Sequence, residues 1–91
     1  MDGFSGKTTI FGIIEYPPAL EYCTYFYPDT KDFDRSVEIA IKLRKIGKTV
    51  KSIDIIIATM ALNRELRVVT KDSDFKRIKL VEPKLKLKLV K

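Results

Sequence analysis

The sequence contains no histidine and only one cysteine, Cys23. Without histidine, the chain cannot have a histidine-based catalytic triad, a histidine general base or a histidine metal ligand. One cysteine cannot form an internal disulfide, and a structural zinc site is nearly excluded as well. Chemistry in this chain must therefore use carboxylates, hydroxyls, lysines and arginines, and the lack of a disulfide favours a cytoplasmic location.

Long apolar runs are also missing. No stretch approaches the roughly 20 residues that span a bilayer, and the N-terminal MDGFSGK does not have the pattern of a secretory signal. We therefore expect no membrane partner. Tryptophan and glutamine are absent while isoleucine and lysine are abundant, which favours a thermophilic source.

The remaining composition is that of a globular protein. Its 91 residues are 45% hydrophobic and 33% charged, which predicts one domain over residues 1–91. The net charge of +6 suits a polyanion such as nucleic acid, although basic proteins of other kinds are common.

The hydrophobic pattern predicts an α/β fold. The clearest helix runs from Thr30 or Asp32, either of which could cap it, to Ile46. A second helix, capped by Ser52 and covering 53–63, is apolar almost all round and should be buried on most sides. The run 7–14 predicts a buried strand, with a turn into a helix near Gly12 as an alternative, and Pro17 ends this segment. We also predict strands over 25–27 and 65–70 and a helical turn over 73–77. The alternating leucines and lysines of 84–91 predict a half-buried or edge strand.

Four acidic residues stand where apolar segments end or are interrupted. Glu15 closes the run TIFGIIE, Asp54 interrupts the second helix in its first turn, and Asp72 and Asp74 follow the strand VVT. A buried carboxylate is costly unless it is paired, hydrogen-bonded or bound to a cation, and carboxylate oxygens suit Mg²⁺ or Mn²⁺. Ligands of parallel sheets bind beyond the carboxyl ends of the strands, where Asp72 falls. These residues are therefore candidate metal ligands.

Each candidate also has a simpler interpretation. Asp54 could be favoured by the helix dipole, Asp72 and Asp74 could be turn or cap residues, and Glu15 could lie on a solvated helix edge. Other polar and aromatic residues have structural interpretations too. Thr70 is interpreted as a strand residue and Lys71 as a solvated charge. Cys23 is interpreted as a small hydrophobe in or near the core, and the aromatics of 22–27 as core and strand residues.

From Pro28 onward the sequence resembles the PIN-domain family. The resemblance rests on SIDIIIA at 52–58, a helix that opens with an aspartate, and on VTKDSDF at 69–75, a strand that ends in Thr-x-Asp-x-Asp-Phe. The earlier TTIFGIIEYPP is similar to the family segment that carries a helical glutamate, here Glu15.

The resemblance implies a three-layer α/β sandwich with a mainly parallel sheet. It also implies an endoribonuclease of the VapC toxin type, with RNA as substrate, an antitoxin-type protein as a possible partner and Mg²⁺ or Mn²⁺ as cofactor. Glu15, Asp54 and Asp72 would be catalytic and would hold the metal, Asp74 would assist in holding it, and Thr70 would orient a carboxylate or a water.

The family's first motif, an aspartate at the end of the first strand, is missing. Asp2 has no apolar strand before it and cannot take this role. We therefore expect a PIN-like domain truncated at its N-terminus, with weak metal binding and a sheet that lacks a strand near its middle. Uncovered apolar surface predicts a homo-oligomer. Two functions stay open: a ribonuclease, weak or inactive, and a non-catalytic module for oligomerisation or for binding RNA or protein.

Overall fold

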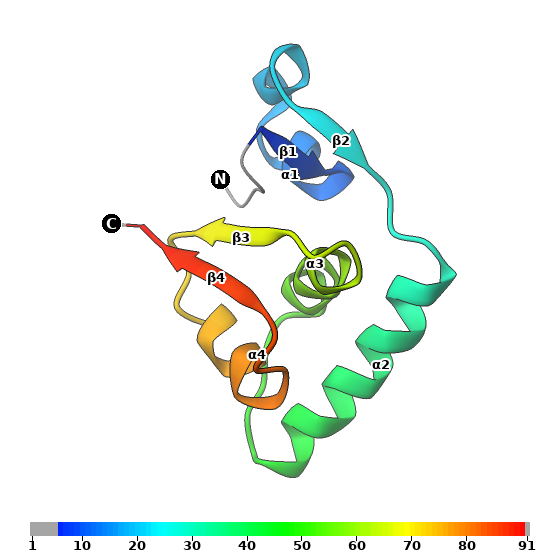
Figure 1. Cartoon of the computed structure of the whole chain (residues 1–91), viewed down its shortest axis with the longest axis vertical. Coiled ribbons are helices and arrows are strands. Elements are labelled where there is room, and N and C mark those ends of the chain that lie inside the picture. Colours follow the sequence, from blue (N-terminus) through cyan, green and yellow to red (C-terminus); the bar gives the residue numbers. More distant parts are fainter. Residues whose placement is uncertain (1–5, 91) are drawn as a thin grey trace.

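Helices and short strands alternate along the chain in the computed structural model, which describes residues 6–90 (Figure 1). The elements are β1 (Lys7–Thr9), α1 (Ile10–Glu15), the 3₁₀ helix η1 (Pro17–Glu21), β2 (Thr24–Phe26), α2 (Thr30–Lys45), α3 (Ser52–Asn63), β3 (Arg67–Thr70), α4 (Phe75–Val81) and β4 (Lys86–Leu89). The molecule is flat, with extents of 40 × 32 × 20 Å. The predicted α/β class is confirmed.

The strands pair in parallel, as expected. β1 pairs with β2, and β3 pairs with β4 so that Val68 lies opposite Leu87. Within residues 6–90 these are two separate two-stranded sheets, whereas the resemblance implied one mainly parallel sheet. The arrows of β2 and β3 point in opposite directions in Figure 1, so the carboxyl ends of the two sheets lie on different sides of the molecule.

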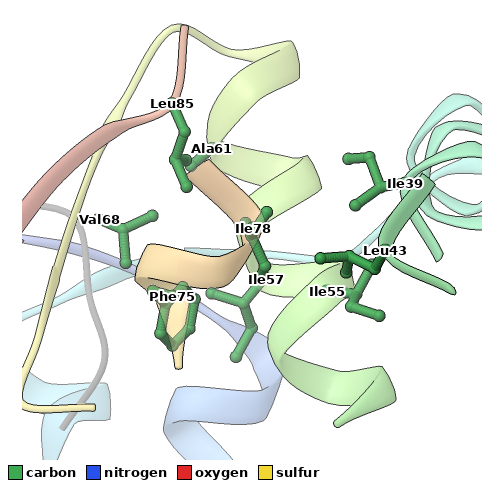
Figure 2. Packing of buried hydrophobic residues seen from close by; sticks show 10 residues of the cluster. Ile39, Leu43, Ile55, Ile57, Ala61, Val68, Phe75, Ile78 and Leu85 are labelled. Atoms are coloured by element: carbon green, nitrogen blue, oxygen red, sulfur yellow. The ribbon is translucent and has the colours of Figure 1, made fainter. Parts of the chain in front are cut away.

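The hydrophobic core lies between α2, α3, α4 and β3 (Figure 2). Its side chains are apolar and at most 7% exposed, and burying each isoleucine, leucine or phenylalanine contributes about 1.5–3 kcal/mol to stability. The core consists of Ile39, Leu43, Ile55, Ile57, Ala58, Ala61, Val68, Phe75, Ile78 and Leu85. It fixes the position of α3 relative to β3, and therefore of the acidic residues that these elements carry.

Helix α2 occurs where the pattern predicted it, but its cap is different. The N-cap is Asp29, and neither Thr30 nor Asp32 takes that position. The Asp29 carboxylate accepts a hydrogen bond from the Asp32 N–H at 2.9 Å, and the Asp32 carboxylate accepts one from the Asp29 N–H at 2.9 Å. This reciprocal capping box satisfies two backbone donors at once, which explains why the helix begins one residue after Asp29.

Helix α3 spans the predicted residues, and the expectation that it is buried on most sides is confirmed by residues such as Met60 and Ala61. The predicted Ser52 cap is wrong. Ser52 is the first helical residue, and the N-cap position belongs to Lys51, whose side chain makes no capping hydrogen bond. Burial in the core, more than capping, holds this helix in place.

The N-terminal region differs most from expectation. The strand predicted over 7–14 ends at Thr9, because the Thr9 hydroxyl accepts a hydrogen bond from the Gly12 N–H at 3.3 Å and caps α1. The first turn of α1 therefore begins before Gly12, and the helix ends before Pro17 as predicted. Asp2 lies outside the described residues.

The aromatic residues of 22–27 do not form a core. Tyr22 is 64% exposed and Tyr27 is 62% exposed, and only Phe26 among the aromatics of that segment packs against the buried cluster. The strand β2 lies at one end of the molecule in Figure 1, where it pairs only with β1 among the described strands. Cys23 is half-buried.

The C-terminal elements follow the predicted order with shifted ends. β3 begins at Arg67, later than predicted, because Glu65 turns the chain with φ of 55° after α3. The predicted turn over 73–77 becomes α4, and the leucine–lysine alternation of β4 is confirmed, since its leucines are half-buried and its lysines exposed. Among the helices of residues 6–90, none has the length and apolar character that crossing a membrane requires.

Candidate metal centre

Three carboxylates converge where α3 begins and β3 ends. Asp54, Asp72 and Asp74 each offer one carboxylate oxygen, and these oxygens all lie within 4.8 Å of one another. Asp54 comes from the first turn of α3 and is only 8% exposed. Asp72 and Asp74 come from the loop between β3 and α4 and are half-buried, so the group has one side toward the interior and one toward solvent.

The loop that carries Asp72 and Asp74 is held by its own hydrogen bonds. The Asp72 N–H donates to the Thr70 hydroxyl at 3.0 Å, and the Asp74 N–H donates to Asp72 Oδ1 at 2.8 Å. Thr70 is fully buried, and its carbonyl accepts a hydrogen bond from the Val90 N–H at 2.9 Å. The loop therefore starts from a fixed point in the β3–β4 sheet, and one oxygen of Asp72 is already oriented.

The simpler interpretations fit two of the aspartates in part. Asp54 lies in the first turn of a twelve-residue helix, where the helix dipole favours a negative charge. Asp74 is at the N-cap position of α4, but its side chain makes no capping hydrogen bond, so its carboxylate is not used for capping. In addition to these roles, Asp54 and Asp74 each contribute a carboxylate oxygen to the group of three aspartates.

The three negative charges repel one another. Two unit charges 4.8 Å apart interact with roughly 1 to 3 kcal/mol between water and a protein surface. Arg77 offsets part of this charge, because its Nη1 lies 3.7 Å from Asp74 Oδ1 and also donates to the Thr49 carbonyl at 3.0 Å. The donor set consists of carboxylate oxygens and is open to water on one side, which is the chemistry that Mg²⁺ and Mn²⁺ require, so the residues present fit such an ion.

Glu15, the fourth candidate ligand, is not part of this group of aspartates. It is the last residue of α1, and its side chain is exposed. The helix that carries Glu15 follows β1 of one sheet, whereas Asp72 follows β3 of the other sheet (Figure 1). Its catalytic role stays a prediction.

A second carboxylate centre was missed by the sequence analysis. Asp32 is fully buried near the other end of α3 and accepts hydrogen bonds from Arg64 Nη1 at 3.0 Å, Arg64 Nη2 at 2.9 Å and Asn63 Nδ2 at 2.8 Å. The Arg64 guanidinium also lies over the Phe26 ring, 4.8 Å from its centre. The only signal in the sequence is the spacing of Asp29 and Asp32, which marks a capping box and does not reveal a distant arginine.

The environment of Asp32 acts on its pKa in two directions. Burial alone would raise the pKa of Asp32, but the Arg64 guanidinium, the Asp29 backbone N–H and the Asn63 amide together hold it below the usual carboxyl range. Asp32 is therefore a charged, fully partnered structural residue. Both of its oxygens accept hydrogen bonds within the chain, so none is left for a ligand.

Comparison with known proteins covers both carboxylate centres. The family model described as PIN domain matches residues 16–80 of the 91 residues. The matched region includes all three clustered aspartates and begins one residue after Glu15. A search among curated proteins finds no match.

Proposed function

The chain belongs to the PIN-domain family, a family of nucleases, and on that premise we propose that it is a metal-dependent endoribonuclease of the VapC toxin type. It would hydrolyse phosphodiester bonds of RNA. The observation that carries the proposal is the convergence of Asp54, Asp72 and Asp74 within 4.8 Å, because these residues come from two elements far apart in the sequence.

The aspartates would hold Mg²⁺ or Mn²⁺. When bound, the ion would lower the pKa of a water and stabilise negative charge on the attacked phosphate. Asp54 provides a fixed, nearly buried oxygen, and the Asp74 N–H orients the carboxylate of Asp72. Arg77 keeps Asp74 next to the group and adds a positive charge on its solvent side.

Basic residues around the aspartates would bind the RNA backbone. Lys51 precedes Asp54, and Lys71 and Lys76 flank the loop of the other two aspartates; all three lysines are exposed. Contacts of this kind bind phosphates without reading the base sequence and weaken as salt increases. The overall charge of +6 supports the same substrate class. The proposed VapC type would also imply an antitoxin-type protein as a partner.

A second candidate function is a non-catalytic module that binds metal or RNA without turnover. One observation favours it: Glu15 lies outside the group of three aspartates. A set of three aspartates can hold an ion, but fewer groups are left to position a water against a phosphate.

The test is a Mn²⁺ titration of the whole chain, followed by calorimetry and by NMR line broadening. We expect saturable binding in the wild-type chain and loss of it in Asp54→Asn and in Asp72→Asn. The matched control is Glu21→Gln, which removes an exposed carboxylate of η1 and should leave binding unchanged.

Cleavage of a labelled single-stranded RNA in the presence of Mn²⁺ separates the two functions. Cleavage that is lost in both aspartate variants supports the ribonuclease. Metal binding without cleavage supports the non-catalytic module. Cleavage that persists in both variants, or no binding at millimolar Mn²⁺, would overturn the proposed metal centre.

A further inference from the structure

A cavity lies at the C-terminal end of α3, whereas the acidic group lies at the beginning of that helix. Its volume is about 480 Å³, within the range of roughly 300–1,000 Å³ that is typical of small-molecule sites. We call it the α3-end cavity. The residues that line it come from α2, from the end of α3 and the turn after it, and from the segment that leads into β4: Arg35, Ala61, Leu62, Glu65, Leu66, Lys84 and Lys86.

Three of the lining residues are cationic, and two of these have no carboxylate partner. Lys84 and Lys86 are exposed, and neither takes part in a salt bridge within residues 6–90. Lys86 Nζ donates a long hydrogen bond of 3.4 Å to the Glu65 carbonyl. Like charges that line one cavity repel one another, so the cavity carries positive charge that an anionic ligand would neutralise.

The third cation, Arg35, is held in place by the protein. Its Nη1 donates to Asn63 Oδ1 at 2.8 Å, and its Nη2 donates to Glu82 Oε2 at 3.4 Å. Asn63 in turn donates to the buried Asp32 at 2.8 Å, so the structural carboxylate centre also fixes Arg35. A guanidinium has more N–H donors than these two contacts use. Arg35 can therefore bind an anion at a small cost in side-chain ordering.

A carboxylate on the same cavity adds a second requirement for the ligand. Glu65 has φ of 55°, a conformation that favours glycine, and it lies in the turn where the Leu66 N–H donates to the Ala61 carbonyl at 2.9 Å. Its carboxylate takes part in no salt bridge within the described residues. A role of the side chain in the cavity accounts for a glutamate at this position. The ligand must then bring hydroxyl donors as well as negative charge.

We propose that the α3-end cavity binds a nucleoside 5′-monophosphate. A phosphate monoester carries about −1.5 to −2 charges at pH 7 and offers three acceptor oxygens, which match one guanidinium and two ammonium groups. The ribose hydroxyls donate to Glu65, as they do to acidic residues in dinucleotide-binding folds. Leu62 and Leu66 provide apolar contact for the sugar and the base.

Two sources offer this chemistry: a free mononucleotide and the 5′-phosphorylated end of an RNA strand. A phosphodiester inside a strand has less charge and fewer free oxygens, so it is a poorer match to the three cations. The site uses none of the clustered aspartates and needs no metal ion. It therefore goes beyond the proposed nuclease function, and its test is independent of that function.

Calorimetric titration of the whole chain with AMP in the presence of EDTA tests the proposal. We expect saturable binding of AMP and weaker binding of adenosine and of 2′-deoxy-AMP. Lys84→Ala and Lys86→Ala should each raise the dissociation constant of AMP about three- to tenfold. The matched control is Lys88→Ala, since Lys88 is an exposed lysine of the same strand as Lys86 but does not line the cavity. Asp72→Asn should also leave AMP binding unchanged.

Glu65→Ala separates nucleotide recognition from a general attraction of anions. The variant should bind AMP about fivefold more weakly, because an acceptor for the ribose hydroxyls is lost. It should bind inorganic phosphate more tightly, because a negative charge is removed from the cavity. Circular dichroism confirms that each variant is folded.

Competition against AMP identifies the source of the phosphate. A short RNA with a 5′-phosphate that displaces AMP, while the same RNA with a 5′-hydroxyl does not, supports the end of a strand as the ligand. Failure of both RNAs to displace AMP supports the free mononucleotide. No binding of AMP at millimolar concentration, an affinity unchanged in both lysine variants, or a Glu65→Ala variant that binds AMP and phosphate equally weakly would overturn the proposal.

Discussion

A carboxylate centre lies at each end of α3, and the two centres differ in the groups that surround the buried aspartate. At the C-terminal end, Asp32 is fully buried, but Arg64 and Asn63 satisfy its oxygens. At the N-terminal end, Asp54 is nearly buried and lies against two further carboxylates, with Arg77 at the edge of the group. Burial of a charge is therefore not by itself a sign of function in this chain.

The difference lies in what each centre can still bind. The two oxygens of Asp32 accept hydrogen bonds from the two Nη atoms of Arg64. This bidentate pair gives geometric specificity and stability but excludes a further cation. The aspartates at the other end collect negative charge that a divalent ion would neutralise. The first centre should thus govern folding, and the second should govern ligand binding.

The largest effect is expected for Asp32→Asn. The change leaves Arg64 without its charge partner next to the core, which should lower the free energy of unfolding by about 3 kcal/mol, and Mn²⁺ affinity should not change. Urea unfolding and calorimetry measure the two quantities. The control is Glu38→Gln, an exposed acid on the same helix, which should change the free energy of unfolding by less than about 0.5 kcal/mol.

For Asp72→Asn we expect the reverse: a change in Mn²⁺ affinity without a loss of stability. Mn²⁺ affinity should fall at least about thirtyfold, because a charged ligand is lost. The free energy of unfolding without metal should stay equal or rise, because repulsion within the group is relieved. Calorimetry and urea unfolding of the metal-free chain test this pair of outcomes. A loss of stability as large as that of Asp32→Asn would show that the acidic group is structural.

A smaller effect on the metal is expected for Thr70→Val. The valine keeps the shape of the buried side chain but removes the oxygen that accepts the Asp72 N–H. Without that acceptor the loop loses one of its fixed points, and Mn²⁺ affinity should fall about tenfold. Thr70→Ser, which keeps the hydroxyl, should restore most of the affinity in the same titration.

The smallest effect is expected from pH. The pKa of Asp32 is lower in the folded chain than in the unfolded chain, so its contribution to stability is fully present above about pH 4 and is lost as the pH falls through the lower, folded value. The free energy of unfolding should therefore decrease on acidification below about pH 4. Asp32→Asn should flatten this part of the pH profile, and an unchanged profile would contradict the assignment.

The sequence predicted those features that depend on local pattern. The amphipathic spacing of α2, the apolar run of α3 and the alternation of β4 each determine their own element, so these elements are where they were expected. The acidic group could be predicted because Asp54 interrupts an apolar helix and Asp72 follows an apolar strand, and a buried carboxylate at such positions is costly unless it is paired, hydrogen-bonded or bound to a cation.

Features that depend on distant partners could not be predicted in this way. The Asp32–Arg64 pair joins residues 32 positions apart in the sequence, and no periodicity reveals it. The exposure of Tyr22 and Tyr27 depends on which elements cover β2, and aromatic residues are compatible with either a core or a surface strand. That Glu15 is not among the clustered aspartates depends on how α1 is placed relative to α3 and β3, which local sequence does not encode.

The contact between Arg64 and Phe26 has a consequence for hydrogen exchange. It links β2, and through its pairing β1, to the end of α3 with one side chain that also holds Asp32. The β1–β2 unit contributes little to the buried cluster, so its backbone amides should open at a lower free energy than those of α3. Arg64→Ala should then release the amides of β1 and β2 to exchange long before the core amides of α3, and the chain should behave as two exchange units instead of one.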